Sequence, residues 1–223
     1  MTEPNQRSHW PAVPLVFYVT DRRGFGLDEP QAAARLLETI ENASRAGVDT
    51  IQIREKDLSG RALLELTTGA MHRAGRTKIV VNDRLDVALA AGAAGVHLGG
   101  ESITVADAFA FRTSGRAPAH LLIGRSCHSL EESTRVENEG ADYIFFGPVF
   151  ATPSKARFGA PQGTAALSAV CRAMRVPVVA IGGITLENAR ECRAAGAAGI
   201  AAIRLFQEAE DFSPLVRNLK QTD

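Results

Sequence analysis

The sequence feature that most constrains the fold is an alternation, repeated eight times, of short apolar segments with longer segments of helix-forming residues. The short segments are almost continuously apolar, as expected for parallel strands that are covered on both faces. The segments between them are rich in Ala, Leu, Glu and Arg, which indicates repeated strand–helix units. The predicted strands span residues 15–20, 50–54, 78–82, 95–98, 121–124, 143–147, 176–181 and 199–203.

Helices are predicted between most of these strands, over residues 30–46, 60–74, 105–114, 130–139, 164–175 and 186–195. The segment 82–95 leaves space for a helix of only about two turns. Thr185 precedes the helix predicted at residue 186. We expect its hydroxyl to cap that helix, because a threonine oxygen can accept a hydrogen bond from a backbone N–H of the first turn.

Two arrangements of parallel strands fit this alternation: a closed barrel and an open, doubly wound sheet. Closed barrels usually need about 200 to 250 residues, and the chain has 223. Eight units without a G-x-G-x-x-G dinucleotide-binding motif favour the barrel. The predicted fold class is therefore α/β, a single (β/α)8 TIM barrel over residues 14–223, preceded by a flexible N-terminal tail over residues 1–13.

Charge and composition narrow the classes of partner. The chain has 25 Lys and Arg residues against 25 Asp and Glu residues, so no net field attracts it to nucleic acid or to an anionic membrane. The first residues lack the apolar core of a signal peptide, and no run of 18 apolar residues occurs, so we expect a cytoplasmic protein. The three cysteines lack C-x-x-C spacing, which argues against a zinc site. The assembly state stays open, with a homo-oligomer among the options.

Polar residues and glycines follow nearly every predicted strand, and in a parallel barrel those ends meet at one rim, where active sites are built. The rim would hold Arg54, Lys56, Lys155 and Arg204 together with the pair Gly182–Gly183. Cations donate to phosphate oxygens, and glycines let backbone N–H groups approach them. This pattern predicts two anion sites and phosphorylated small-molecule substrates, although strand ends are also polar simply because loops are solvated.

Two further features at the rim are each compatible with a functional and an ordinary explanation. The long segment after the sixth strand contains hydroxyls, glycines and Lys155, so it is equally a closing lid or a surface loop. Asp83 follows a buried strand and is a candidate Mg²⁺ ligand, since Mg²⁺ commonly takes one or two protein carboxylates and completes its shell with phosphate oxygens. The alternative for Asp83 is a helix cap.

The residues at these strand ends resemble those of a known family, the thiamine-phosphate synthases, which also contains the thiazole tautomerases. The likeness runs from about residue 17 to residue 206, and its six segments occur in order at predicted strand ends. Those segments are Q-I-R-E-K (52–56), V-N-D-R (81–84), G-V-H-L-G (95–99), G-R-S-C-H-S (124–129), G-P-V-F-A-T-P-S-K (147–155) and A-I-G-G-I (180–184).

The resemblance implies an enzyme of thiamine biosynthesis that joins hydroxymethylpyrimidine diphosphate to hydroxyethylthiazole phosphate and releases pyrophosphate. It also implies the roles of individual residues. The family's diphosphate and metal positions fall on Arg54, Lys56, Asn82 and Asp83, its pyrimidine contact on Gln52, its catalytic positions on Ser126 and Lys155, and its thiazole-phosphate positions on Thr152, Ser154, Gly183 and the backbone around Ile203.

Two residues depart from the family pattern. Family synthases usually carry a second metal-binding aspartate where this chain has Ser102, so the expected Mg²⁺ site lacks one carboxylate. Glu101, or Ser102 through a water molecule, is the available substitute, and a hydroxyl is a poorer Mg²⁺ ligand than a carboxylate. Arg204 replaces a serine beside the thiazole phosphate, where it would either strengthen phosphate binding or fill the pocket.

These departures leave two alternatives to the synthase. A thiazole tautomerase moves a proton without metal or diphosphate, and His128 would then be its acid and base. A catalytically silent sensor would keep only the phosphate site. The nearly complete diphosphate set favours the synthase over the tautomerase, and the neutral charge and the lack of a DNA-reading helix with a basic face argue against the sensor. His97, inside a predicted strand, is interpreted as a hydrogen-bonded core residue.

Overall fold

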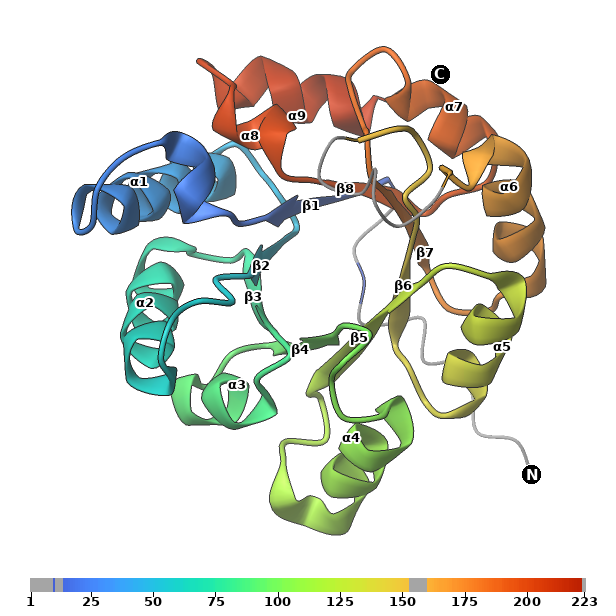
Figure 1. Cartoon of the computed structure of the whole chain (residues 1–223), viewed down its shortest axis with the longest axis horizontal. Coiled ribbons are helices and arrows are strands. Elements are labelled where there is room, and N and C mark those ends of the chain that lie inside the picture. The colour runs from blue at the N-terminus through green and yellow to red at the C-terminus, as the bar shows by residue number, and fades with distance from the viewer. Residues whose placement is uncertain (1–9, 11–13, 153–159, 222–223) are drawn as a thin grey trace.

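A computed structural model describes residue 10 and residues 14–152 and 160–221, and it confirms the (β/α)8 barrel (Figure 1). All neighbouring strands are parallel, and β1 pairs with β8 through Leu15 and Gly199 to close the sheet. The strands are β1 (Leu15–Val19), β2 (Thr50–Ile53), β3 (Lys78–Asn82), β4 (Gly95–Leu98), β5 (Leu122–Cys127), β6 (Tyr143–Phe146), β7 (Val178–Ile181) and β8 (Gly199–Ala202).

Helices surround the barrel in the order that the sequence predicts (Figure 1). The short α3 is present, and α8 and α9 were not predicted. The helical segments are η2 (Arg22–Phe25), α1 (Gln31–Arg45), α2 (Gly60–Arg73), α3 (Leu85–Ala91), α4 (Val105–Phe111), η3 (Arg112–Arg116), α5 (Leu130–Asn138), α6 (Gly163–Ala173), α7 (Ala189–Ala194), α8 (Arg204–Gln207) and α9 (Phe212–Lys220).

Several predicted boundaries differ from the structure, and two of them, at β5 and α7, concern residues discussed below. β5 continues to Cys127, three residues beyond the prediction, so Ser126 lies inside the strand. The helix expected at residue 186 becomes regular only at Ala189. The turn before it is held by a reciprocal pair of bonds: Asn188 Oδ1 accepts from the N–H of Thr185 at 2.8 Å, and Thr185 Oγ1 accepts from the N–H of Asn188 at 3.3 Å. Because this is a capping-box arrangement, Thr185 caps the turn that leads into α7, as predicted, and only the start of the regular helix was wrong.

Apolar side chains fill two separate layers. One lies between the strands and the helices, and the other lies inside the barrel, where Phe17, Tyr143 and Phe145 pack ring against ring. Trp10, the one described residue in the predicted N-terminal tail, adds its ring to this interior cluster, 5.2 Å from the ring of Tyr143. The remainder of that predicted tail lies outside the described residues. Within the described part of the chain, no helix has the length and apolar character needed to cross a bilayer.

Closure of so narrow a barrel requires glycine where strands come closest. A Cβ atom on Gly95 would lie 2.3 Å from the carbonyl oxygen of Leu122 on the paired strand, which is well inside van der Waals contact. Neither backbone can retreat without breaking ladder hydrogen bonds on both sides. Gly95 is therefore a requirement of the packing, as its place in a buried strand indicates.

We expect Gly95→Ala to lower the free energy of unfolding by about 1–3 kcal/mol, the usual cost of overpacking a core. Urea-induced unfolding followed by circular dichroism measures this. Gly69→Ala is the matched control, because a Cβ there would meet the Leu37 side chain at an ordinary 3.5 Å and α2 would gain a better helix former. Equal midpoints for the two variants would contradict the interpretation.

Candidate active site at the barrel mouth

The upper interior of the barrel is polar, in contrast to the aromatic layer below it. Gln52 on β2 and Asn82 on β3 are both buried, and Gln52 Nε2 donates to Asn82 Oδ1 at 2.8 Å. Strand alternation places Gln52 inward, because its neighbours Ile51 and Ile53 belong to the outer apolar layer. Two of the residues predicted to bind substrate are thus in direct contact at the carboxyl ends of adjacent strands.

Asp83 adopts an unusual backbone conformation that turns its carboxylate toward β4. Its φ is +62°, a left-handed value that aspartate tolerates better than most residues, and its N–H donates to the carbonyl of His97 at 2.9 Å. One carboxylate oxygen accepts from the N–H of Gly99 at 2.7 Å and from the hydroxyl of Ser102. The carboxylate does not cap α3, so the helix-cap alternative is not the one observed.

The other oxygen of Asp83 accepts from Asn82 Nδ2 at 2.5 Å and lies 3.3 Å from Lys56 Nζ. Burial by itself would raise the pKa of Asp83. The hydrogen bonds from Ser102 and Gly99 and the charge of Lys56 outweigh burial and hold that pKa below its usual range. Asp83 is therefore an anion at neutral pH, and Lys56, although more than half exposed, is held at the same mouth.

The oxygen atoms around Asp83 allow a test of whether a Mg²⁺ ion would fit at this position. Asp83 is a hard anionic ligand, and the Ser102 hydroxyl and the Asn82 amide lie beside it. Among the described residues, however, no group of three acidic, histidine or cysteine side chains could form a metal site. The arrangement fits a Mg²⁺ ion that takes one protein carboxylate and completes its octahedral shell with phosphate oxygens and water.

Ser126 is linked to two buried aromatic residues. His97 Nε2 lies 2.9 Å from Ser126 Oγ, and His97 Nδ1 lies 3.1 Å from the hydroxyl of Tyr143. Gly124 makes space for this chain, since a Cβ there would lie 2.1 Å from the Tyr143 ring. Burial lowers the pKa of His97 to about 3, so its imidazole is neutral and acts as a hydrogen-bonding spacer. The interpretation of His97 as a core residue is confirmed, with the addition that it contacts Ser126.

Arg54 follows β2 on the same face as Gln52. Its backbone N–H donates to Thr20 Oγ1 at 2.9 Å, which continues the pairing of β1 with β2 beyond the regular strand. Its charge contributes to the lowered pKa of His97, which lies inside the barrel. Arg54 therefore belongs to the same mouth as Lys56 and Asp83.

A second group of predicted residues lies across the mouth, after β6, β7 and β8. Gly183 has a φ of +68°, and a Cβ there would lie 2.6 Å from the carbonyl oxygen of Ala151. The N–H of Phe150 donates to the carbonyl of Gly182 at 3.0 Å, so the segment leading to Thr152 is bound to the glycine turn. This close backbone approach brings two of the predicted phosphate-binding segments together.

The remaining predicted site residues lie after β5, β6 and β8. Ile203 precedes α8, and Arg204 begins it with an exposed side chain, which argues against the option that Arg204 fills the pocket. His128 lies beyond the end of β5, where its Nδ1 contacts the carbonyl of Gly147. Ser154 and Lys155 lie outside the described residues.

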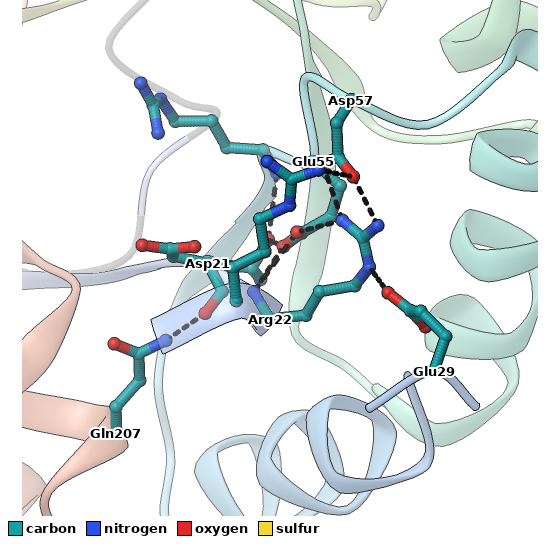
Figure 2. A network of polar contacts seen from close by, with 9 residues as sticks. Asp21, Arg22, Glu29, Glu55, Asp57 and Gln207 are labelled. Carbon is teal, nitrogen blue, oxygen red and sulfur yellow. Dashed lines mark hydrogen bonds and ion pairs between the residues drawn. The ribbon is translucent and has the colours of Figure 1, made fainter. Parts of the chain in front are cut away.

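Sequence reasoning missed a group of paired ionic residues in the loops after β1 and β2. Glu55, to which the sequence pattern assigned no role of its own, is only 4% exposed and contacts Arg22 (Figure 2). No periodicity could pair these residues, because 33 positions separate them in the chain. An available signal was the strict alternation of charge in Arg54–Glu55–Lys56–Asp57.

Comparisons with known proteins agree with this geometry. The family model described as thiamine monophosphate synthase matches residues 19–206. A thiamine-phosphate synthase of Methanocella arvoryzae is 43% identical over 209 residues, which cover 91% of this chain and 92% of that protein. A thiamine-phosphate synthase of Chlorobium luteolum is 40% identical over 185 residues, which cover 82% of this chain and 85% of that protein.

Among solved structures, a thiamine phosphate pyrophosphorylase from Pyrococcus furiosus superposes with a TM-score of 0.76 at 34% identity, and the match covers 92% of this chain and 93% of that one. A 3-hexulose-6-phosphate synthase with a TM-score of 0.67 and 19% identity shares the fold. Since the family model and the relatives extend over most of the barrel, including every described strand end discussed above, this chain belongs to the thiamine monophosphate synthase family.

Proposed function

We propose that this protein is a thiamine-phosphate synthase, a transferase that joins hydroxymethylpyrimidine diphosphate to hydroxyethylthiazole phosphate. The observation that carries the proposal is the arrangement of Arg54, Lys56 and Asp83 beside the Gln52–Asn82 amide pair in one barrel mouth. Such a mouth offers cations to a diphosphate and amide groups to a heterocycle. Family membership supplies the identity of the two substrates.

In this reaction the bond between the pyrimidine methylene carbon and the diphosphate oxygen breaks, and the thiazole nitrogen forms a new bond to that carbon. The electron pair of the broken bond leaves with pyrophosphate. We assign Arg54 and Lys56 to the leaving diphosphate, where donors placed in advance stabilise the developing negative charge. A bound Mg²⁺ would neutralise further charge on the diphosphate, and Asp83 would hold it.

The remaining residues are assigned by their positions. Gln52 and Ser126 would contact the pyrimidine, with Ser126 oriented by the neutral imidazole of His97. Thr152, Ser154, Gly183, the backbone of Ile203 and the exposed Arg204 would bind the thiazole phosphate, and Lys155 would approach the diphosphate from the segment after β6. The homo-oligomer and the cytoplasmic location stay predictions.

The two alternatives find less support. The two relatives reported above are named thiamine-phosphate synthases and the most similar structure reported is named a thiamine phosphate pyrophosphorylase, so the tautomerase finds no support among them. The ring of His128 is bound to the Gly147 carbonyl outside the strand, and it is Ser126 that lies in the barrel interior. A silent sensor would not need the buried Ser126–His97–Tyr143 chain.

Incubation of the purified protein with both substrates and Mg²⁺ should yield thiamine phosphate and pyrophosphate in equal amounts. We expect Arg54→Ala and Lys56→Ala each to lower kcat/KM by about 100-fold, as found when a donor to a developing charge is removed. Arg61→Ala, on the exposed surface of α2, is the control. Absence of product from the wild-type protein, with conversion of a non-aromatic thiazole instead, would refute the synthase and support the tautomerase.

The Mg²⁺ requirement should respond to Ser102. Ser102→Asp places a second carboxylate beside Asp83, so the Mg²⁺ concentration for half-maximal rate should fall by about 10-fold. Ser102→Ala, which removes the hydroxyl without adding charge, serves as the comparison. Calorimetric titration of Mg²⁺ in the presence of pyrophosphate gives an independent measure, and an unchanged Mg²⁺ affinity in Ser102→Asp would contradict the assigned metal position.

Titration of His97 should not contribute to the pH dependence of kcat/KM. Because burial holds its pKa at about 3, the imidazole is uncharged across the range of the assay. Plots of kcat/KM against pH for the wild type and for His97→Gln should therefore differ in height and coincide in shape between about pH 5 and pH 8. An inflection that disappears in the variant would mean that His97 titrates during the reaction.

A further inference from the structure

In the loops that follow β1 and β2, one arginine contacts three acidic residues. Arg22 is only 3% exposed, and its Nη1 lies 3.0 Å from Glu55 Oε2 and 2.7 Å from Asp57 Oδ1. Its Nη2 lies 2.5 Å from Asp57 Oδ2, and its Nε contacts Glu29 (Figure 2). The guanidinium therefore uses both of its edges and all three of its nitrogens, so a lysine could not replace it.

Glu55 receives further hydrogen bonds from β1 and the turn after it. Its Oε1 accepts from Thr20 Oγ1 at 2.6 Å, and both of its oxygens accept from the backbone N–H of Arg22, at 3.2 and 3.1 Å. Thr20 is fully buried, and its Oγ1 also accepts from the N–H of Arg54. A continuous chain of hydrogen bonds thus joins Arg22 to the backbone of a predicted diphosphate-binding residue.

The loop after β2 divides its side chains between two directions. Glu55 and Asp57 contact Arg22, whereas the intervening Lys56 reaches Asp83 on the next loop. Arg54, which precedes Glu55, directly follows β2 on the same face as Gln52. Acidic residues that hold the network therefore alternate with basic residues of the mouth, so fixing one set fixes the direction of the other.

Stability alone is a poor explanation for this arrangement. Removing charges from water is costly, and buried ion pairs replaced by apolar groups often leave proteins equally stable. Burial raises the pKa of Glu55, which records that cost, while the hydrogen bonds from Arg22 lower the pKa of Asp57 to about 2. A network that is expensive to bury but rigid when complete is suited to holding the geometry of a site.

We propose that Arg22, Glu55 and Asp57 form a positioning clamp that aims Arg54 and Lys56 at the diphosphate group of the substrate. The inference rests on the diphosphate role proposed above for those two cations. None of the three clamp residues would touch the substrate. They would act by restricting the loop after β2, so that two long and flexible side chains start from a fixed backbone.

The test is calorimetric binding of inorganic pyrophosphate to the full-length protein. Arg22→Lys keeps the charge and loses the multiple contacts, and Asp57→Asn weakens the same clamp at a position exposed enough to tolerate the change. Each should weaken pyrophosphate binding by at least about 10-fold, because small displacements of a charged group are costly to its function. In the synthase assay, Arg22→Lys and Asp57→Asn should also lower kcat/KM, and the variant that weakens pyrophosphate binding more should lower kcat/KM more.

Arg112→Lys is the matched control for a purely structural effect. Arg112 is also buried and paired, with Nη1 2.6 Å from Asp142 Oδ2 and 2.7 Å from the carbonyl of Leu121, but it lies at the opposite end of the barrel. Arg112→Lys should reduce thermal stability as Arg22→Lys does, and it should leave pyrophosphate affinity within about twofold of wild type. Equal loss of affinity in the two variants would mean that general destabilisation is the cause, and would overturn the proposal.

A double-mutant cycle separates the clamp from the site itself. If Arg22 acts through the two cations, Arg22→Lys should have little further effect on pyrophosphate binding in an Arg54→Ala, Lys56→Ala background. Full additivity, or wild-type affinity in both clamp variants, would overturn the proposal. Failure of the wild-type protein to bind pyrophosphate would instead refute the diphosphate role of Arg54 and Lys56, and the clamp with it.

Discussion

The hydrogen-bond ladder between β1 and β8 is the constraint on which the rest of the molecule depends. By closing the sheet, it brings the carboxyl ends of all eight strands to one mouth, where side chains from different strands meet, as Gln52 and Asn82 do. Closure also sets the narrow interior that aromatic and aliphatic side chains fill, and it brings strands so close that Gly95 cannot carry a side chain. The apolar lower interior then excludes water from below, which leaves the upper interior as the place where polar side chains can meet a ligand.

Within that mouth, hydrogen bonds between polar side chains hold those side chains in fixed positions. Asp83 accepts four donors and adopts a left-handed backbone to do so, a conformation that costs of order 1 kcal/mol or more. Ser126 depends in the same way on a histidine that burial keeps neutral. Each group fixes the position of another before any substrate arrives, which is the condition for electrostatic stabilisation without reorganisation during the reaction.

The sequence predicted what depends on local pattern and missed what depends on distant pairing. Strand positions, barrel closure and the polar rim all follow from apolar runs and their polar ends, and the contact of Lys56 with Asp83 follows from adjacent strands. The predicted end of β5 and the predicted start of α7 were wrong. Composition does not record that strand pairing continues through Arg125, or that a capped turn precedes the regular helix. The partnership of Arg22 with Glu55 joins two loops and has no periodic signature.

The single carboxylate at the candidate metal position gives the cations of the mouth greater weight. Where Ser102 donates to Asp83, the local negative charge is smaller than two aspartates would provide, so the site repels a diphosphate less and attracts a divalent ion less. In the proposed reaction, neutralising the leaving group would then depend more on Lys56 and Arg54. Flexible cations assigned to this task would need a rigid backbone to start from, and under the positioning role proposed above the buried guanidinium of Arg22, with its three acidic partners, would provide one.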